Sequence, residues 1–309
     1  MIVGVAPARA ALVGNPSDGY GGAVLTTALE MWSAIVELEP GGRDDVVDGP
    51  DGLVPIVASA RLVARRRLGD IAPARLRVRT SVPREVGLAG SSAVVIATLD
   101  ATARQAGIVL DRERWPSLAL HVETAQLGIP GGLQDRVAQV WGGVVLCDVR
   151  ADRVATVDGL EQGTYRRLDP DRLPALAVAW LPTAGQSSRV SQAGLRAGDD
   201  GPERRAIFAD LGALAVETTR RLGRGESEAL GPAMAATMAA RRRLVPLVAA
   251  HADLVDRLAS TGAHVNYTGS GGAVVTTLPE GGIRALGAAL PPGGRVEPLR
   301  VAPERPGLS

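Results

Sequence analysis

Short apolar runs separated by glycine- and proline-rich turns follow one another along the whole chain. Their spacing predicts both strands and helices. In the first half, strands are expected over residues 3–13, 23–38, 76–82 and 144–149. Helices are expected over residues 53–67, 92–106, 116–128 and 131–140. The first half therefore combines strands with helices.

The second half shows the same mixture of patterns. Strands are expected over residues 175–181, 263–267, 273–278 and 295–301. Helices are expected over residues 203–222, 226–258 and 281–290. Proline lacks a backbone N–H and clashes with the preceding helical turn, so we expect Pro246 to kink or split the helix over residues 226–258.

A charged, irregular stretch at residues 150–174 separates the two halves. A chain of 309 residues with 46% hydrophobic content can bury a sizeable core, and its length fits two modest domains better than one large domain. We therefore expect one domain at residues 1–165 and a second at residues 166–309.

Composition excludes several classes of function. The formal net charge is +1 and aromatic residues make up 3% of the chain, so we expect neither nucleic acid nor a membrane as a partner. All 34 basic residues are arginine, because the sequence contains no lysine. This excludes Schiff-base enzymes and the Walker A phosphate loop, since both need a lysine.

Cysteine and histidine usage adds two expectations. A single cysteine, Cys147, cannot form an internal disulfide, which fits a reducing compartment. The three histidines lack the spacing of a helical metal motif. With no secretion signal apparent at the N-terminus, we expect a cytoplasmic protein.

Residues 83–93, PREVGLAGSSA, place glycines and hydroxyl residues at the start of a predicted helix. A helix N-terminus offers unpaired N–H groups and partial positive charge, so Gly87, Gly90, Ser91 and Ser92 are candidates for binding phosphate without a lysine. A plain turn capped by a serine fits the same residues, since serine is a favoured N-cap.

Two carboxylates downstream are further candidates. Glu123 lies near the end of a predicted helix, where the helix dipole disfavours it, and Mg²⁺ with nucleotide phosphates would compensate. Asp135 precedes Arg136 and would stay ionised, as a hydroxyl-activating base must. The alternatives are a solvated glutamate and an ordinary surface Asp–Arg pair.

The glycine-rich loop at residues 267–273 lies between two predicted strands. Glycine permits close backbone approach to a ligand or to another loop. A long hairpin loop without a binding role fits it equally well.

These motifs together resemble those of the GHMP kinases, the superfamily of galactokinase, homoserine kinase and mevalonate kinase. The resemblance runs in order through residues 7–18, 83–93 and 267–273. Within the superfamily the sequence is most similar to the glucuronokinases known from plants, through GNPSD at 14–18, residues 128–140 and TGSGGAVV at 268–275.

The resemblance implies an α+β fold with an N-terminal domain of the ribosomal-protein type and a C-terminal ferredoxin-like domain, with ATP and a sugar bound between them. It implies a loop around the ATP phosphates, formed by Pro83, Gly87, Leu88, Ala89, Gly90, Ser91, Ser92 and Ala93. Ser92, with Ser91 as a further candidate, and Glu123 would hold Mg²⁺.

The remaining roles follow from the same resemblance. Asp135 would orient or deprotonate the sugar hydroxyl, and Arg9 would lie near the transferred phosphoryl group. The residues expected to contact the sugar or support its pocket are Asn15, Asp18, Gly269, Ser270, Gly271 and Gly272.

The sequence departs from the superfamily at two positions. Ala89 replaces the glycine or serine often found there, and Arg9 stands where some members use a lysine. Arginine keeps a permanent charge and cannot accept a proton, so Arg9 cannot act as a base. Phosphoryl transfer depends mainly on positioning and charge neutralisation, so the change need not abolish it.

The resulting hypothesis is an ATP- and Mg²⁺-dependent kinase, a monomer or homodimer, that phosphorylates the anomeric hydroxyl of D-glucuronate or a related sugar. Two alternatives remain open. One is a kinase of the same fold acting on another sugar or on a small alcohol such as mevalonate or homoserine. The other is a catalytically silent nucleotide-binding relative. The run Arg241–Arg243 is expected to be a solvated helix face.

Overall fold

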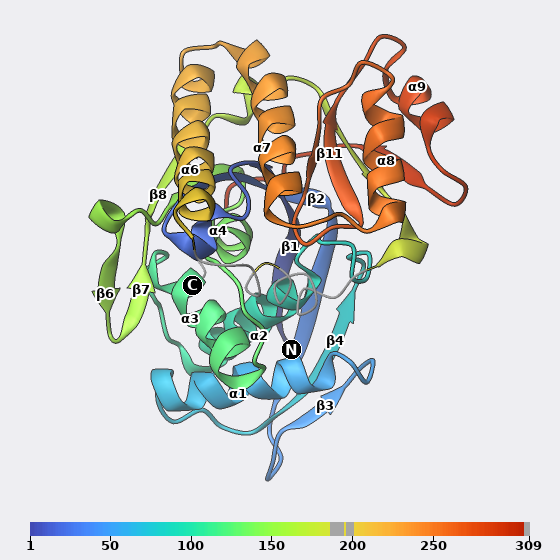
Figure 1. Cartoon of the computed structure of the whole chain (residues 1–309). Coiled ribbons are helices and arrows are strands. Elements are labelled where there is room, and N and C mark those ends of the chain that lie inside the picture. Colours follow the sequence, from blue (N-terminus) through green and yellow to red (C-terminus); the bar gives the residue numbers. More distant parts are fainter. Residues whose placement is uncertain (186–194, 196–200, 306–309) are drawn as a thin grey trace.

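The structure is a computed structural model that describes residues 1–185, 195 and 201–305 (Figure 1). Its larger sheet has six strands in the order β3-β4-β2-β5-β8, and β1 also pairs with β2. The strands are β1 (Ile2–Val13), β2 (Ala23–Pro40), β3 (Val46–Asp48), β4 (Ala74–Thr80), β5 (Val144–Asp148) and β8 (Thr164–Leu168). All their pairings are antiparallel except that of β3 with β4.

Four helices belong to this part of the chain: α1 (Val54–Leu68), α2 (Gly90–Ala106), α3 (Arg114–His121) and α4 (Gln134–Trp141). Apolar side chains of α1, α2 and α3 share one core with β1, β2 and β4. Every residue of α2 from Ser92 to Ala103 is buried, which explains its nearly uninterrupted apolar sequence. The burial of these residues therefore fixes the position of the helix and of its first turn.

The smaller sheet has the strand order β10-β11-β9-β12. Its strands are β9 (Leu176–Trp180), β10 (Val265–Tyr267), β11 (Ala273–Thr277) and β12 (Arg295–Pro298). The accompanying helices are α6 (Pro202–Gly223), α7 (Leu230–Leu244), α8 (Ala249–Ala259) and α9 (Gly282–Ala289). Figure 1 shows α6, α7 and α8 at the end of the molecule opposite α1. One apolar cluster joins α6 and α7 to β1, β2 and β5 of the larger sheet and to Leu176 and Val275 of the smaller sheet, so the two sheets share packed side chains.

Most predicted elements are confirmed to within a few residues. The helix expected over residues 226–258 is split at Pro246, because α7 ends at Leu244 and α8 begins at Ala249. The helix expected over residues 116–128 is wrong in its second half: α3 ends at His121, and a π-helical turn, Val122–Gln126, follows. Such turns inside helices are frequent at functional sites.

The stretch at residues 150–174 is more regular than its charge pattern suggests. It contains the two-stranded hairpin of β6 (Ala155–Val157) and β7 (Leu160–Gln162), and then β8, which pairs with β5 of the larger sheet. These strands are mostly exposed, so their charged residues obscure the alternation that reveals a strand. The division into domains at residues 165 and 166 stays a prediction.

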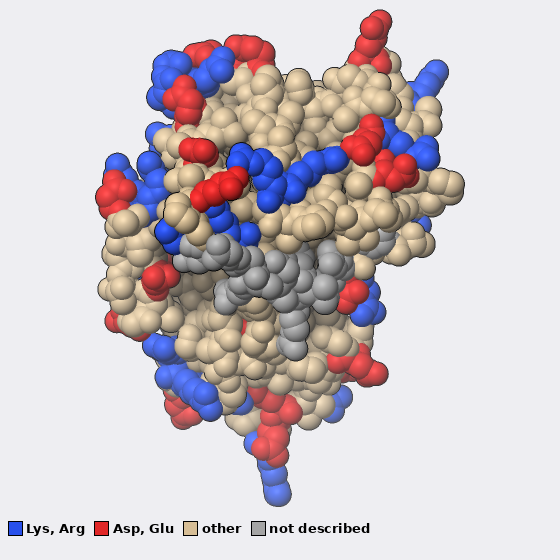
Figure 2. Space-filling view, in the orientation of Figure 1, with Lys and Arg blue, Asp and Glu red and all other residues tan. Residues whose placement is uncertain are grey.

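On the face shown in Figure 2, arginine and acidic side chains are interspersed. Among the helices of the described residues, none is long and apolar enough to cross a membrane.

Candidate active site

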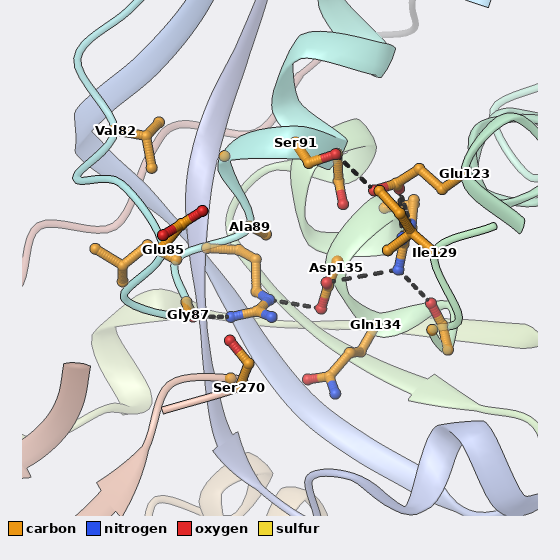
Figure 3. Close-up of a pocket in the computed structure, with 18 of the residues that line it drawn as sticks. Val82, Glu85, Gly87, Ala89, Ser91, Glu123, Ile129, Gln134, Asp135 and Ser270 are labelled. Atoms are coloured by element: carbon orange, nitrogen blue, oxygen red, sulfur yellow. Dashed lines mark hydrogen bonds and ion pairs between the residues drawn. The ribbon is translucent and has the colours of Figure 1, made fainter. Parts of the chain in front are cut away.

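One cavity of about 510 Å³ contains most of the sequence-predicted residues (Figure 3). Its lining residues come from distant parts of the chain: Arg9, Arg241, and residues within the segments 15–19, 50–56, 80–92, 123–136 and 269–270. Leu53, Ile56 and Val82 contribute apolar surface, whereas Asn15 and Asp18 contribute polar groups. The cavity therefore offers both apolar and polar surface to a ligand.

The loop before α2 presents an uncapped helix N-terminus to this cavity. The N-cap residue is Ala89, with a left-handed φ of 58°, and no side chain caps the helix. Ser91 and Ser92 lie inside the first turn, so the alternative of a serine-capped turn is wrong. The first N–H groups of α2 remain available to an anion. The left-handed conformation costs an alanine about 1 kcal/mol, a cost that a glycine would not carry.

The glycine loop between β10 and β11 lies against this phosphate-loop candidate. The Gly87 carbonyl accepts a hydrogen bond from the Thr268 hydroxyl at 2.9 Å. A Cβ atom on Gly87 would come within 2.9 Å of the Ser270 nitrogen, and one on Gly269 within 2.4 Å of the Gly87 carbonyl oxygen. Both glycines are thus required for close backbone approach. The loop is a hairpin and also lines the cavity through Gly269 and Ser270.

Arg9 and Asp135 form the central ion pair. A register shift in β1 lies between Pro7 and Ala8, shortly before Arg9. The Arg9 Nε donates to Asp135 Oδ1 at 2.7 Å, and its Nη1 donates to the Gly87 and Thr268 carbonyl oxygens at 2.8 and 2.6 Å. No described residue accepts a hydrogen bond from its Nη2. Arg9 therefore ties both loops to Asp135 and keeps one donor group for a ligand.

Asp135 is the second residue of α4 and faces the cavity. Burial alone would raise the pKa of its carboxyl, but the charges of Arg9 and Arg136 and the hydrogen bond from Arg9 outweigh it and hold the pKa below its usual value. Asp135 is therefore ionised at neutral pH and acts as an acceptor. The dashed lines in Figure 3 mark these contacts.

Glu123 is held in the π-helical turn and is 1% exposed, so the alternative of a solvated glutamate is wrong. Arg136 binds its Oε2, through Nε at 2.8 Å and also through Nη2, while Ser91 donates to its Oε1 at 3.0 Å. Arg136 is 2% exposed, which also excludes an ordinary surface Asp–Arg pair. Its closer partner is Glu123, because its Nη1 lies 3.5 Å from Asp135.

The oxygen atoms around Glu123 fit a magnesium–nucleotide site better than an all-protein metal site. No group of three or more histidine, cysteine or acidic side chains in the described residues could hold a metal. One carboxylate with neighbouring serine hydroxyls is the ligand set typical of Mg²⁺ that keeps nucleotide phosphates and water. The hydroxyl that contacts Glu123 belongs to Ser91, whereas Ser92 is 2% exposed and lines the cavity. Ser92 as a ligand stays a prediction.

Asn15, Asp18 and Gln134 form a polar cluster on another part of the wall. The Gln134 side-chain nitrogen donates to Asn15 Oδ1 at 2.7 Å and to Asp18 Oδ1 at 3.0 Å. The Gln134 backbone N–H donates to Asp18 Oδ2 at 3.0 Å. A Cβ atom on Gly132 would lie 2.0 Å from that Oδ2, so glycine is required here. The cluster fixes several acceptor atoms that sugar hydroxyls can use.

Burial raises the pKa of Asp18 to about 6, and the charge of Asp135 adds to the rise, although the Gln134 backbone hydrogen bond and two arginines oppose it. The folded state therefore binds this proton more tightly than the unfolded state. We expect Asp18 to contribute about 3 kcal/mol to the free energy of unfolding below pH 4, and to lose that contribution as the pH rises through about 6.

Urea unfolding of the wild type and of Asp18→Asn between pH 4 and 8 measures this contribution. The difference in unfolding free energy, wild type minus variant, is expected to fall by about 2 kcal/mol over this pH range, because part of the full contribution is already lost at pH 4. The exposed Asp210→Asn on α6 is the control and is expected to leave the profile unchanged. A difference for Asp18→Asn that does not change with pH would contradict the raised pKa.

The other sequence-predicted residues are near but not all in the cavity wall. The residues of the predicted phosphate loop that line it are Pro83, Gly87, Leu88, Ala89, Gly90, Ser91 and Ser92. Ala93 instead lies in the core of the larger sheet. Gly271 and Gly272 pack against Tyr267, His251 and Val86 in left-handed conformations, outside the cavity lining. The roles of all these residues stay predictions.

Sequence reasoning missed three residues of the site: Gln134, Arg136 as the partner of Glu123, and Arg241. Gln134 and Arg136 flank Asp135 in the quoted motif, so their position was a usable signal. Arg241 was assigned to a solvated helix face, and this is wrong, because the residue is 2% exposed and lines the cavity.

Residues 55–143 match a family model described as GHMP kinases N terminal domain. Glucuronokinase 1 of Arabidopsis thaliana is 31% identical over 308 residues, covering 89% of this chain and 84% of that protein. Probable glucuronokinase 2 of the same plant is 31% identical over 340 residues, covering 96% of this chain and 91% of that protein.

Among solved structures, galactokinase of Lactococcus lactis complexed with galactose matches with a TM-score of 0.79 and 12% identity. The match covers 98% of this chain and 94% of that chain. A likeness at this identity concerns the fold, and it confirms the expected two-domain α+β architecture.

Proposed function

Because this chain belongs to the GHMP kinases and is related to glucuronokinases over nearly its whole length, we propose that it transfers the γ-phosphoryl group of ATP to the anomeric hydroxyl of D-glucuronate or a closely related sugar acid. The wider class, an ATP-dependent sugar kinase acting on an alcohol group, follows from the family. The choice of acceptor is supported by the likeness to the two Arabidopsis proteins.

One observation carries the chemistry: an aspartate kept ionised by two arginines faces a cavity bounded by an uncapped helix N-terminus. In the proposed reaction, Asp135 orients the sugar hydroxyl and accepts its proton as the hydroxyl oxygen attacks the γ-phosphorus. The bond from that phosphorus to the β,γ-bridging oxygen breaks, and ADP leaves with the electron pair. A weakly basic carboxylate suits this reaction, because phosphoryl transfer depends mainly on positioning and charge stabilisation.

The first N–H groups of α2 would bind the ATP phosphates, with Arg9 Nη2 near the transferred group. Glu123, Ser91 and Ser92 would hold Mg²⁺, which would neutralise charge on the phosphates. The apolar residues Leu53, Ile56 and Val82 in the same wall suit the adenine ring. The remaining polar cluster of Asn15, Asp18 and Gln134 would then face the sugar.

A panel of acceptors tests the assignment. Purified protein is incubated with ATP and Mg²⁺ and with glucuronate, galacturonate, glucose, galactose, mevalonate or homoserine, and ADP release is followed. We expect glucuronate or galacturonate to give the highest kcat/KM, and ³¹P NMR to show an anomeric phosphate as the product. Turnover of mevalonate or homoserine without turnover of any uronate would overturn the proposed acceptor. The assignment to the GHMP kinases would stand.

Nucleotide binding with no transfer to any acceptor would instead favour the catalytically silent alternative. The contacts of Asp135 and Glu123 support an active enzyme, because their ion pairs and orientation serve no evident purpose in a silent relative. We further propose that the protein acts in the cytoplasm, in keeping with its single, buried Cys147. A monomer or a homodimer stays the expectation for its assembly.

A further inference from the structure

Three consecutive arginines near the end of α7 have different environments. Arg242 pairs with Asp256 at 2.6 Å and Arg243 with Glu203 at 2.8 Å, and both arginine side chains are exposed at the surface. Arg241 is 2% exposed and lines the active-site cavity. Successive residues on a helix are about 100° apart, so burying the face that carries Arg241 turns its neighbours outward.

Arg241 has no ionic partner among the described residues. Its guanidinium carbon lies 5.0 Å from the centroid of the Tyr267 ring, a cation–π contact. Its Nε is buried without a hydrogen-bond partner. Burial, together with the charge of Arg9, lowers the pKa of Arg241 to about 10, although Tyr267 opposes the change. The side chain thus remains a cation at neutral pH.

A buried cation without a carboxylate is costly for the folded protein. The cation–π contact offsets only part of that cost, because an aromatic ring carries no net negative charge. The cost is removed if an anion arrives with the ligand. Among the described residues, Arg241 is in this respect unlike Arg9 and Arg136, which are both satisfied by acidic side chains.

The position of Arg241 favours the acceptor over the nucleotide as the source of that anion. Thr237, one helical turn earlier on the same face of α7, accepts a hydrogen bond from the Gly14 N–H at 3.2 Å. This contact brings α7 beside the segment that carries Asn15 and Asp18. Arg241 therefore enters the cavity wall on the side of the polar cluster. The phosphates are already assigned to the uncapped N-terminus of α2 in the proposed function.

We infer that Arg241 binds the carboxylate of an acidic acceptor, which for the proposed reaction is the C6 carboxylate of a uronic acid. The inference rests on the proposed function. A planar guanidinium matches a carboxylate with two parallel hydrogen bonds, and such a pair is strong where water is excluded. Arg241 would thus determine specificity for sugar acids over neutral sugars.

The test compares glucuronate with glucuronamide, in which the carboxylate is replaced by a neutral amide. We expect the wild type to prefer glucuronate in kcat/KM by about 10²-fold or more, because loss of one partner from a buried charge pair costs several kcal/mol. In Arg241→Met, kcat/KM for glucuronate is expected to fall by about 10² to 10³. Activity on glucuronamide and the KM for ATP are expected to change little.

Matched variants separate a charge effect from a structural effect. Arg241→Lys keeps the charge but not the planar guanidinium group. It is expected to retain part of the preference for glucuronate that Arg241→Met loses. Arg242→Met, next along the helix, is expected to leave it unchanged. The preference is the ratio of kcat/KM for glucuronate to kcat/KM for glucuronamide, measured on one preparation. A lower fraction of folded enzyme changes both values equally and does not alter their ratio.

The outcomes distinguish this inference from the acceptor assignment. A wild type that uses glucuronamide as well as glucuronate, or an equal loss on both acceptors in Arg241→Met, would overturn the role of Arg241 and leave the kinase assignment intact. A raised KM for ATP with an unchanged acceptor preference would assign Arg241 to the nucleotide and overturn the inference. Turnover restricted to neutral sugars would overturn both.

Discussion

Replacing Asp135 with asparagine is expected to lower kcat by about 10² to 10⁴, the range that a positioned general base supplies. The amide nearly preserves the size of the side chain but removes its negative charge and its ability to accept a proton. Steady-state ADP release with saturating acceptor measures the loss. Because the nucleotide contacts proposed for α2 do not involve Asp135, the dissociation constant for ATP, measured by calorimetry, is expected to change little.

A matched control is available outside the cavity. Asp148 is also buried and paired with an arginine, Arg150, at 2.7 Å, but it does not line the cavity. Asp148→Asn is expected to reduce stability without reducing kcat of the folded enzyme. Near-normal turnover in a folded Asp135→Asn protein would remove Asp135 from the proposed role.

The second large effect is expected for Arg9→Gln. Arginines that meet a transferred phosphoryl group contribute about 10³ to 10⁵ in rate, so we expect a loss on the order of 10³ in kcat. Removing the positive charge also allows burial to raise the pKa of Asp135, since Arg9 opposes that effect in the wild type. The loss of kcat on the acid side of the pH profile is therefore expected to begin at a higher pH in Arg9→Gln than in the wild type.

The fold should survive this change. The Gly87 carbonyl retains its hydrogen bond from the Thr268 hydroxyl, and the Thr268 carbonyl retains one from the Ala11 N–H at 2.8 Å. Arg9→Lys keeps the charge but not the guanidinium group, which reaches Asp135 through Nε and the two carbonyl oxygens through Nη1, and is expected to recover part of the rate. Arg61, buried and paired with Asp45 outside the cavity, gives the control: Arg61→Gln should lower stability but not kcat of the folded fraction.

If Arg9→Gln loses turnover without any change in the pH profile, the proposed electrostatic link from Arg9 to Asp135 is wrong. If neither turnover nor profile changes in the folded variant, Arg9 has no part in catalysis.

Much of the secondary structure could be predicted, because its causes are local. Apolar spacing locates α2, and the missing N–H of Pro246 explains the break between α7 and α8. The π-helical turn at Val122–Gln126 has no such local signal. It accompanies the burial of Glu123 against Arg136 and Ser91, and those contacts are visible only once α2 and α4 are packed.

Several residues of the candidate site could be predicted from the sequence, but their pairings could not. The motifs identified Arg9, Asp135 and Glu123, yet 126 residues separate Arg9 from Asp135, so no local pattern reveals their ion pair. Because Arg136 follows Asp135 in the sequence, proximity suggests an ion pair between these two residues. In the folded protein the closer ionic partner of Arg136 is Glu123. For Arg241 the deciding factor is the rotation of α7 against the smaller sheet, which composition and charge runs do not encode.

The contact between Gly87 and the loop at residues 268–270 has a consequence for how this protein is made. The loop before α2 is encoded early in the chain, but the backbone that supports it belongs to a hairpin synthesised some 180 residues later. Contacts between such distant segments form late, because a long intervening loop must first be closed. A nascent chain that carries the whole PREVGLAGSSA segment thus still lacks the partner that shapes it. The loop before α2 can therefore reach its folded conformation only after residues 268–270 have been synthesised.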